Sequence, residues 1–203
     1  YESLSGVSAF VHPEGVYKDP KGARLRKNIY ERLRYHFEFQ NELLLFPEIA
    51  HRETFSLNIY SKPQPVSFDS ISNIFDAKCI SECYETTSDK PVPQIKDANG
   101  NWNTSGHPDR IIHVGQPELE VFARLFEGTD NWQSAHLPAL HISSSMPVLK
   151  CLCNCNRTFK SLGSDIFSTN MWPETSAQKD GIIQYAPHVP ESLVDTILQG
   201  PHF

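Results

Sequence analysis

Phe46 and Pro47, in the segment LLLFPEIAHRE, are the residues of this sequence best suited to hold a flat ligand. A bulky aromatic side chain beside a proline, held in a turn between strands, provides a stacking platform. A residue of the hydrophobic core would suit the same position, so both interpretations stay open. A polar segment, Glu48 to Glu53, follows directly, and its Arg52 is a candidate contact for an anionic partner.

Basic side chains concentrate in residues 18–34, which hold seven of the 18 Lys and Arg residues against two acids. The whole chain has a formal charge of −6, so its remainder is clearly acidic. One basic stripe on an acidic body can neutralise phosphates locally while avoiding indiscriminate binding. A solvated helix face is the alternative.

The five cysteines do not form a zinc motif. Cys79 and Cys83 have helical i, i+4 spacing, and the helix expected around CLCNC would separate Cys153 from Cys151 and Cys155. A structural zinc site needs thiolates that converge from turns, so ordinary helix cysteines are favoured and no metal is expected. An odd cysteine count rules out complete pairing within one chain and favours a reduced, cytoplasmic setting.

The remaining catalytic signatures are absent from the sequence. Asp69, Asp76 and Lys78 resemble a carboxylate–lysine set for Mg²⁺ only faintly, and Asp76 better suits a helix cap. The sequence contains no nucleophile elbow, P-loop, glycine-rich dinucleotide turn or HExxH motif. No apolar run is long enough to span a membrane. The chain therefore has no complete catalytic constellation, and it begins without Met, as a fragment would.

The elements that position these residues alternate between strand and helix. The pattern predicts strands at about 7–11, 35–39 and 54–62, and a helix at about 23–33. This order predicts an α/β to α+β fold, with a partial mixed sheet that ends in an antiparallel hairpin with flanking helices, followed by an irregular α+β region.

The second part of the chain is more irregular. SKPQPVSFDS, residues 61–70, is a proline-broken connector and a predicted boundary. Helices are expected at about 76–85, 116–127 and 143–155, the second with Leu119, Phe122, Ala123 and Phe126 facing inward and with Gly128 ending it. Between the first two of these helices lies a loop that is too long and polar to be a mere connector, and Trp102, Asn103, His107 and Arg110 cluster in it. The alternative is that this loop only caps the sheet.

Together, several phrases resemble the C-terminal half of the catalytic domain of γ-class N6-adenine DNA methyltransferases. In that family an apolar strand ends in a proline near the cofactor pocket, as in AFVHPEG, and a helix like RLRKNIYERL follows. A strand then reaches a phenylalanine–proline turn, matched by Phe46 and Pro47, before a last strand like FSLNIY. The phrases NWNTSGHPDRIIHV, MWPETSAQKDGIIQY and LQGPHF resemble the downstream region of the same enzymes.

The resemblance implies a part of a restriction–modification (type IIG-like) or phage-defence enzyme. Residues 1–62 would be the end of the catalytic domain, and residues 63–203 a downstream target-recognition region. Such enzymes extrude the target adenine from double-stranded DNA, by base flipping, before S-adenosylmethionine-dependent transfer. In the family, a phenylalanine at the position of Phe46 stacks on the extruded base. The resemblance also implies that Lys18, Lys21 and Arg24 lie where DNA phosphates could approach. In the same interpretation, the candidates for contacts to bases are Trp102, Asn103, His107 and Arg110.

One departure bears on activity. The family's Asn/Asp-Pro-Pro-Tyr/Phe motif and its glycine-bearing loop for S-adenosylmethionine are both missing from this sequence. The resemblance places both upstream, in the remainder of the parent chain. This chain alone is therefore expected to bind DNA without a cofactor and without catalytic residues of its own. The alternative is a non-enzymatic, cytoplasmic module that binds another protein.

Overall fold

The computed structural model describes residues 6–85, 91–155, 162–164 and 174–182. The chain forms two compact units, Tyr1–Asn156 and Arg157–Phe203. In the second unit the described structure includes the short helix α6, Glu174–Lys179, on which Ala177 is buried. The phrases at 171–185 and 198–203 that contribute to the family resemblance lie largely outside the described residues.

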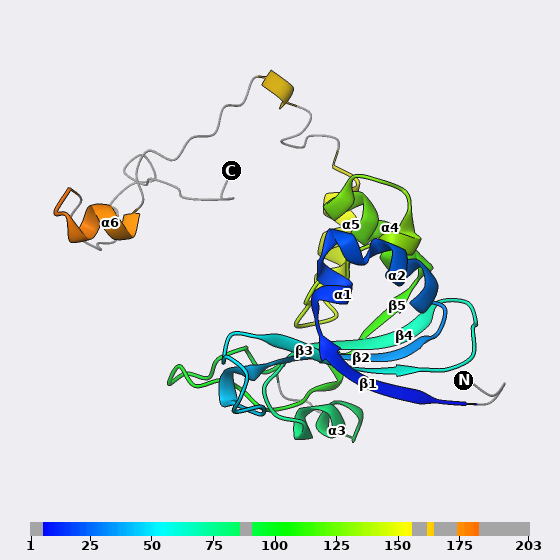
Figure 1. Cartoon of the computed structure of the whole chain (residues 1–203), viewed down its shortest axis with the longest axis horizontal. Helices are drawn as coiled ribbons and strands as arrows, with labels where there is room; N and C mark the ends of the chain where they lie inside the picture. The colour runs from blue at the N-terminus through cyan, green and yellow to red at the C-terminus, as the bar shows by residue number, and fades with distance from the viewer. Residues whose placement is uncertain (1–5, 86–90, 156–161, 165–173, 183–203) are drawn as a thin grey trace. The chain divides into compact units, whose positions relative to one another are not determined.

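The first unit is built on a five-stranded mixed sheet of order β1-β3-β2-β4-β5 (Figure 1). Strands β2 and β4 are parallel, and the other neighbours are antiparallel, so β1, β2 and β4 run in one direction. The expected mixed sheet with a β2–β3 hairpin and flanking helices is confirmed. The strands are β1 (Ser8–Pro13), β2 (Leu33–Gln40), β3 (Thr54–Tyr60), β4 (Ser67–Ile74) and β5 (Ile112–Gly115).

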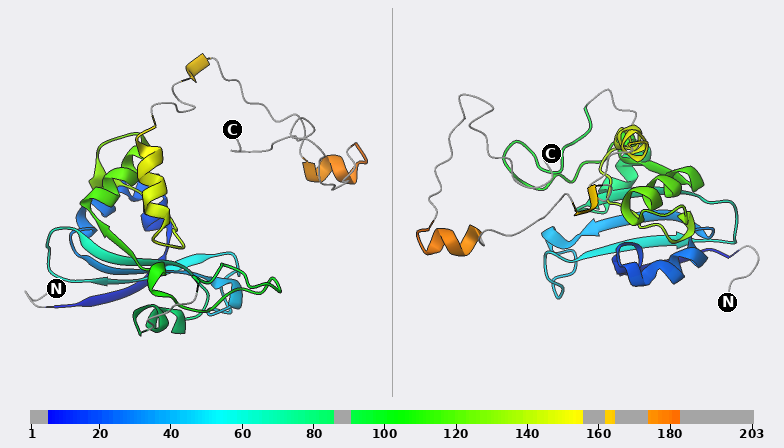
Figure 2. Two further views of the ribbon diagram at one scale, coloured as in Figure 1. Left: turned by 180° about the vertical axis from the view of Figure 1, so that it is seen from behind. Right: turned by 90° about the horizontal axis from the view of Figure 1, so that it is seen from above.

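Helices cover the two faces of the sheet unequally (Figures 1 and 2). On one face lie α1 (Gly15–Lys18), α2 (Ala23–Ile29), α4 (Gln116–Phe122) and α5 (Ser145–Cys153). On the other face lies α3 (Lys78–Glu85). No helix in the described part of the chain combines the length and the apolar character needed to cross a membrane.

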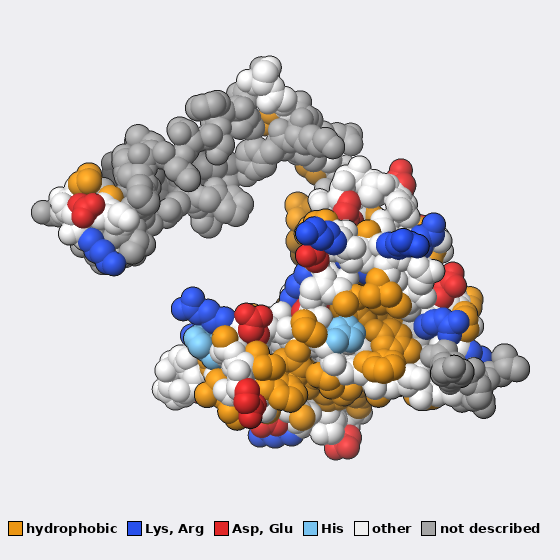
Figure 3. Space-filling view, in the orientation of Figure 1, with side chains coloured by type: hydrophobic (Ala, Val, Ile, Leu, Met, Phe, Trp, Pro, Cys, Tyr) orange, Lys and Arg blue, Asp and Glu red, His pale blue; other side chains and the backbone are white. Residues whose placement is uncertain are grey.

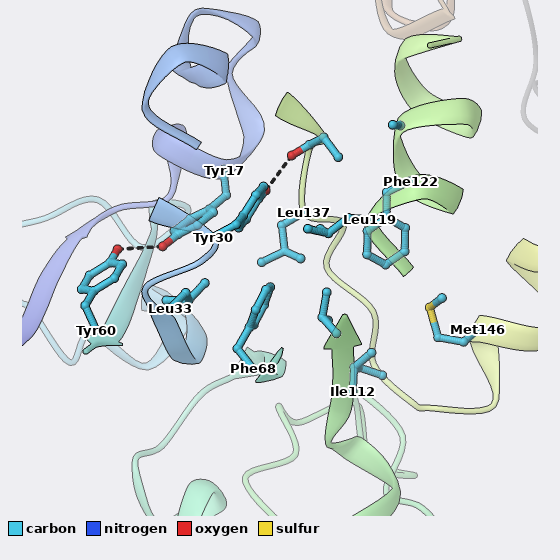
Figure 4. Packing of buried hydrophobic residues seen from close by; sticks show 13 residues of the cluster. Tyr17, Tyr30, Leu33, Tyr60, Phe68, Ile112, Leu119, Phe122, Leu137 and Met146 are labelled. Atoms are coloured by element: carbon cyan, nitrogen blue, oxygen red, sulfur yellow. Dashed lines mark hydrogen bonds between the residues drawn. The ribbon is translucent and has the colours of Figure 1, made fainter. Parts of the chain in front are cut away.

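The larger core lies between the sheet and the four helices (Figure 4). Tyr17 and Tyr60 share a hydrogen bond of 2.8 Å between their hydroxyls, and the Tyr30 hydroxyl donates to the Ala135 carbonyl at 2.6 Å. Buried tyrosines need such partners, because an unpaired hydroxyl in the core costs stability. The smaller core, under α3, includes Phe37, Phe39, Ile71, Ile74, Cys79 and Cys83.

Three local expectations need correction. The helix predicted to continue to Leu33 ends at Ile29, because Leu33 is buried in β2 opposite Tyr60. The predicted connector 61–70 contains the start of strand β4. Phe126 is 53% exposed instead of buried. The helix widens to a π-helix over Ala123–Glu127, and this wider turn changes which side chains face the core.

The predicted boundary after residue 62 falls between β3 and β4, two strands of the same sheet. β4 follows that boundary, yet it pairs with β2 in parallel and contributes Phe68, Ile71 and Ile74 to the two cores. One sheet therefore contains strands from both predicted regions.

Candidate functional site

Phe46 lies in the loop of residues 41–53 that joins β2 to β3. The loop closes at its base, where the backbone N–H of Asn41 donates to the Glu53 carbonyl at 3.0 Å. It begins with a 3₁₀ turn, Asn41–Leu43, and Leu44 adopts a left-handed backbone with φ of 54°. A non-glycine residue in this conformation needs support from its surroundings.

The side chain of Asn41 provides that support from the inside of the loop. Asn41 is fully buried, and its Oδ1 accepts from the backbone N–H of Phe46 at 3.0 Å. Its Nδ2 donates to the carbonyls of Phe46 and Ile49, each at 2.9 Å, and lies 3.4 Å from that of Ala50. The Asn41 amide thus supplies hydrogen-bond partners to backbone groups of the loop, which strand pairing would otherwise provide.

The ring of Phe46 rests on an aromatic stack of the sheet. Its centroid lies 4.9 Å from that of Phe55 at an interplanar angle of 81°. Phe55 in turn lies nearly parallel to Phe39, with centroids 5.1 Å apart. Phe46 remains 38% exposed. The ring is therefore anchored on one side and accessible on another, which core packing alone does not require.

Phe46 also lines a pocket of about 250 Å³ at the carboxyl end of β1. This is slightly below the roughly 300–1,000 Å³ of pockets for drug-sized ligands, and it suits one small planar group. Most of the lining is apolar, and the polar groups come from His12, Glu53 and Thr54. The full lining is Val11, His12, Pro13, Phe46, Ile49, Glu53, Thr54 and Phe55.

His12 is held in a defined orientation at this pocket. Its Nδ1 lies 3.0 Å from the carbonyl of Pro13, and its Nε2 lies 3.0 Å from the Asn58 Nδ2. Because the Asn58 amide donates and the carbonyl accepts, these contacts fit the tautomer with its proton on Nδ1. The fixed imidazole and the proline place polar and apolar surface side by side in the pocket.

The predicted phosphate contacts divide into exposed and engaged side chains. Lys21, Arg24 and Arg52 are exposed, and Arg52 belongs to the same loop as Phe46. Lys18 forms an ion pair with the buried Glu38, although its side chain is 39% exposed. The Lys18 charge is therefore partly neutralised by Glu38 and is less available to a phosphate.

Another cation of the basic stripe is entirely structural. Arg26 is 1% exposed and donates from Nη1 to the carbonyls of Val16 and Asp19, and from Nε to that of Ser134. The burial of Arg26 therefore accounts for part of the local excess of basic residues without requiring an anionic binding partner. The stripe interpretation therefore applies to fewer residues than the sequence suggested.

Arg110, a predicted contact to bases, lies inside the protein. It is 1% exposed and donates to the carbonyls of Ser72 and Asn73 at 2.9 and 3.0 Å. It also donates to the Ser105 carbonyl at 2.8 Å and to the Cys79 thiol at 2.9 Å. These contacts tie the end of β4 to the following loop, so the structure gives Arg110 a structural position instead of a DNA-facing one.

The other three loop candidates also have intramolecular partners. His107 is 6% exposed, and its Nδ1 accepts from the backbone N–H of Asp109. Asn103 accepts from the backbone N–H of Ser105 at 3.0 Å. Trp102 stacks on Phe75, with centroids 4.8 Å apart, and carries Lys96 over its ring at 4.2 Å. Trp102 and Asn103 stay half-buried, whereas the burial of His107 removes it from an accessible surface.

The cysteines of α3 share a buried face, as predicted from their spacing. The backbone N–H of Lys78 donates to the Asp76 carboxylate at 2.9 Å, so Asp76 caps this helix as expected. Within the described ranges, no three His, Cys, Asp or Glu side chains come together in a way that could hold a metal ion.

Comparisons with known proteins give no family assignment. No family model matches the sequence, no curated protein matches it, and no solved structure matches the fold.

Proposed function

We propose that this chain is a DNA-binding part of an adenine-specific DNA methyltransferase of the restriction–modification type. In this proposal, Phe46 stacks on an adenine extruded from the duplex. The supporting observation is a half-exposed aromatic ring on an internally fastened loop, at the rim of a pocket sized for one small planar group. A base that stacks on this ring recovers part of the stacking lost on leaving the helix.

The exposed cations fit the same proposal. Arg52 follows Phe46 in its loop, and Lys21 and Arg24 project from the turn before α2 and from its start. Contacts of this kind fix the position of a protein on the phosphate backbone without reading the sequence. Base-specific contacts would come from other parts of the interface.

In this proposal, the residues that would hold S-adenosylmethionine lie outside this chain. The sequence has neither the glycine-bearing loop nor the Asn/Asp-Pro-Pro-aromatic motif of the family. We therefore assign the cofactor and the methyl transfer to the remainder of the proposed parent protein.

The edge of the sheet at β1 is a suitable place for that remainder. β1 pairs with β3 and, among the described strands, with no other. Phe10 on one face of β1 and Val11 on the other are 58% and 56% exposed. Apolar residues on both faces are typical of a parallel strand that is covered on both sides. Hydrophobic side chains extend over this side of the molecule in Figure 3.

The same apolar surface supports the rival function, a module that binds another protein. Besides the residues of β1, the loop exposes Leu43, Leu44, Leu45 and Ile49. A large exposed apolar surface is common at protein–protein interfaces. The two functions differ in their response to salt and to an unpaired adenine.

The test compares three duplexes of about 20 base pairs that are otherwise identical in sequence. The first is fully paired, the second has one adenine opposite an abasic site, and the third has one thymine opposite an abasic site. We expect affinity to fall steeply with salt for all three, since phosphate contacts release counterions. We also expect tighter binding to the adenine duplex than to the other two. Phe46→Ala should remove a stacking contribution of about 1–3 kcal/mol, and Phe46→Trp should retain it.

Phe10→Ala is the matched control, because Phe10 is an exposed aromatic that does not line the Phe46 pocket. It should leave the preference for the unpaired adenine unchanged. Weak binding without salt dependence, or an equal affinity for the three duplexes, would reject the proposal and favour the rival.

A further inference from the structure

Asn41 is the one residue of the loop 41–53 that is buried, and it lies at the base of this loop. Asn41 is fully buried, while Leu44 and Phe46 around it are 51% and 38% exposed. The loop thus has an inverted organisation, with an amide inside and large apolar side chains outside. Such a loop gains its order from hydrogen bonds instead of from apolar burial.

The contacts of Asn41 converge on the residue that carries the ring. Its Oδ1 accepts from the N–H of Phe46 and its Nδ2 donates to the carbonyl of Phe46. Both backbone groups that flank the Phe46 Cα are therefore fixed by one side chain. The further bond to the Ile49 carbonyl fixes the next pocket residue of the same loop.

We infer that Asn41 is the positioning residue of the Phe46 platform, and this inference rests on the proposed function. The amide holds the backbone of Phe46 in place before a ligand binds, so the ring does not have to be ordered at that moment. Ordering one side chain on binding costs about two- to twelve-fold in affinity. Asn41 itself is buried and acts on the ligand only through Phe46.

Two substitutions separate the functions of the two ends of the amide. Asn41→Asp keeps an oxygen that can accept from the Phe46 N–H, but it places a carboxylate against the carbonyls of Phe46 and Ile49. Asn41→Ala removes both functions. Tyr30→Phe is the matched control, because it deletes one buried hydrogen bond, to the Ala135 carbonyl, in the core beneath α2.

The first measurement is hydrogen exchange at the Phe46 amide in the full chain. We expect Asn41→Ala to accelerate exchange there by at least about tenfold relative to the wild type, and Tyr30→Phe to leave it unchanged after correction for global stability. An unchanged Phe46 amide in Asn41→Ala overturns the inference.

The second measurement is the preference for the duplex with an unpaired adenine over the fully paired duplex. Asn41→Ala and Asn41→Asp should each reduce this preference by about two- to twelve-fold. Tyr30→Phe should retain it even where it lowers the melting temperature. If the wild type prefers the unpaired adenine and both Asn41 variants keep that preference, the inference alone is overturned. If the wild type has no preference, the proposed function fails.

Discussion

Nε2 of His36 lies 3.0 Å from Oε1 of Glu14, and both side chains are only 1% exposed. On the other side of the ring, Nδ1 lies 3.1 Å from the Ser70 hydroxyl. The second oxygen of Glu14 has no hydrogen-bond partner among the described residues. This pair joins the segment after β1 to the centre of β2, beneath α1.

Removing one member of this pair should destabilise the fold strongly. Glu14→Ala leaves His36 buried without its partner, and we expect the free energy of unfolding to fall by about 3–5 kcal/mol. Urea unfolding followed by circular dichroism measures the change. Lys21→Ala, at an exposed position of the neighbouring turn, should change it by less than about 0.5 kcal/mol. A loss below about 1 kcal/mol for Glu14→Ala would show that the pair contributes little.

The same pair should make stability depend on pH in the acid range. Burial raises the pKa of Glu14, but the charge and hydrogen bond of His36, the nearby Ser56 hydroxyl and the charge of Lys18 outweigh it. The net pKa therefore lies below the ordinary value of 4.5. A depressed carboxyl pKa stabilises the fold above the unfolded-state value, and this stabilisation disappears as pH falls below it.

We expect the free energy of unfolding of the wild type to fall more steeply below about pH 4.5 than that of Glu14→Gln, which cannot ionise at this position. Urea titrations at several pH values between about 6 and about 3 provide the comparison. Parallel curves for the two proteins would assign the acid sensitivity to other carboxyl groups.

Arginines 24 and 110 should behave oppositely when each is replaced by alanine. Arg24 is exposed, so Arg24→Ala should leave stability unchanged and lower the slope of log affinity against log salt by about 1. Arg110→Ala leaves the carbonyls of Ser72, Asn73 and Ser105 without their donor, and should cost more than about 2 kcal/mol. Fluorescence anisotropy with labelled duplex and urea unfolding measure the two effects. If Arg110→Ala kept the stability of the wild type but lost DNA binding, Arg110 would contact DNA and would not be a structural residue.

Cysteine labelling should follow exposure more closely than acidity. The neighbouring Cys79 thiol, the backbone of His107 and the charge of Arg110 lower the pKa of the Cys83 thiol against the effect of burial. Cys83 is nevertheless 1% exposed, whereas Cys151 is exposed. Iodoacetamide should therefore modify Cys151 in the native chain and Cys83 after unfolding, as measured by peptide mass spectrometry. Rapid native modification of Cys83 would indicate that α3 opens readily.

The strands at about 7–11, 35–39 and 54–62 could be predicted from the sequence, because their residue types and alternation are typical of strands. The buried face could not be predicted in the same way, since in β3 the polar Ser56 and Asn58 are fully buried while Leu57 is only partly buried. β4 was harder to find. Its Ser70, Ser72 and Asn73 are buried although they are polar, and the sequence does not reveal that His36 lies beside Ser70 or Gln40 beside Asn73. Polar residues of this kind predict turns unless their tertiary partners are known.

Phe46 could be proposed as a site residue from the sequence, whereas the residue that positions it could not. A turn aromatic next to proline is visible in sequence, whereas the contribution of Asn41 depends on the path of the chain at Phe46 and Ile49. The only sequence signal for Asn41 is an asparagine directly after a strand, a common turn residue. Arg110 illustrates the converse, since a charged residue in a polar loop gives no indication that carbonyls from β4 surround its guanidinium.

The pairing of β2 with β4 also decides how the molecule can be shortened for expression. A truncation after residue 62 would delete β4 and α3, leaving β2 with β3 as its only neighbour and uncovering Phe37 and Phe39. A polypeptide that ends near Asn156 keeps the whole sheet and both sets of packed side chains. A truncation near Asn156 should therefore yield soluble, folded protein, whereas expression of the first 62 residues alone should yield insoluble material.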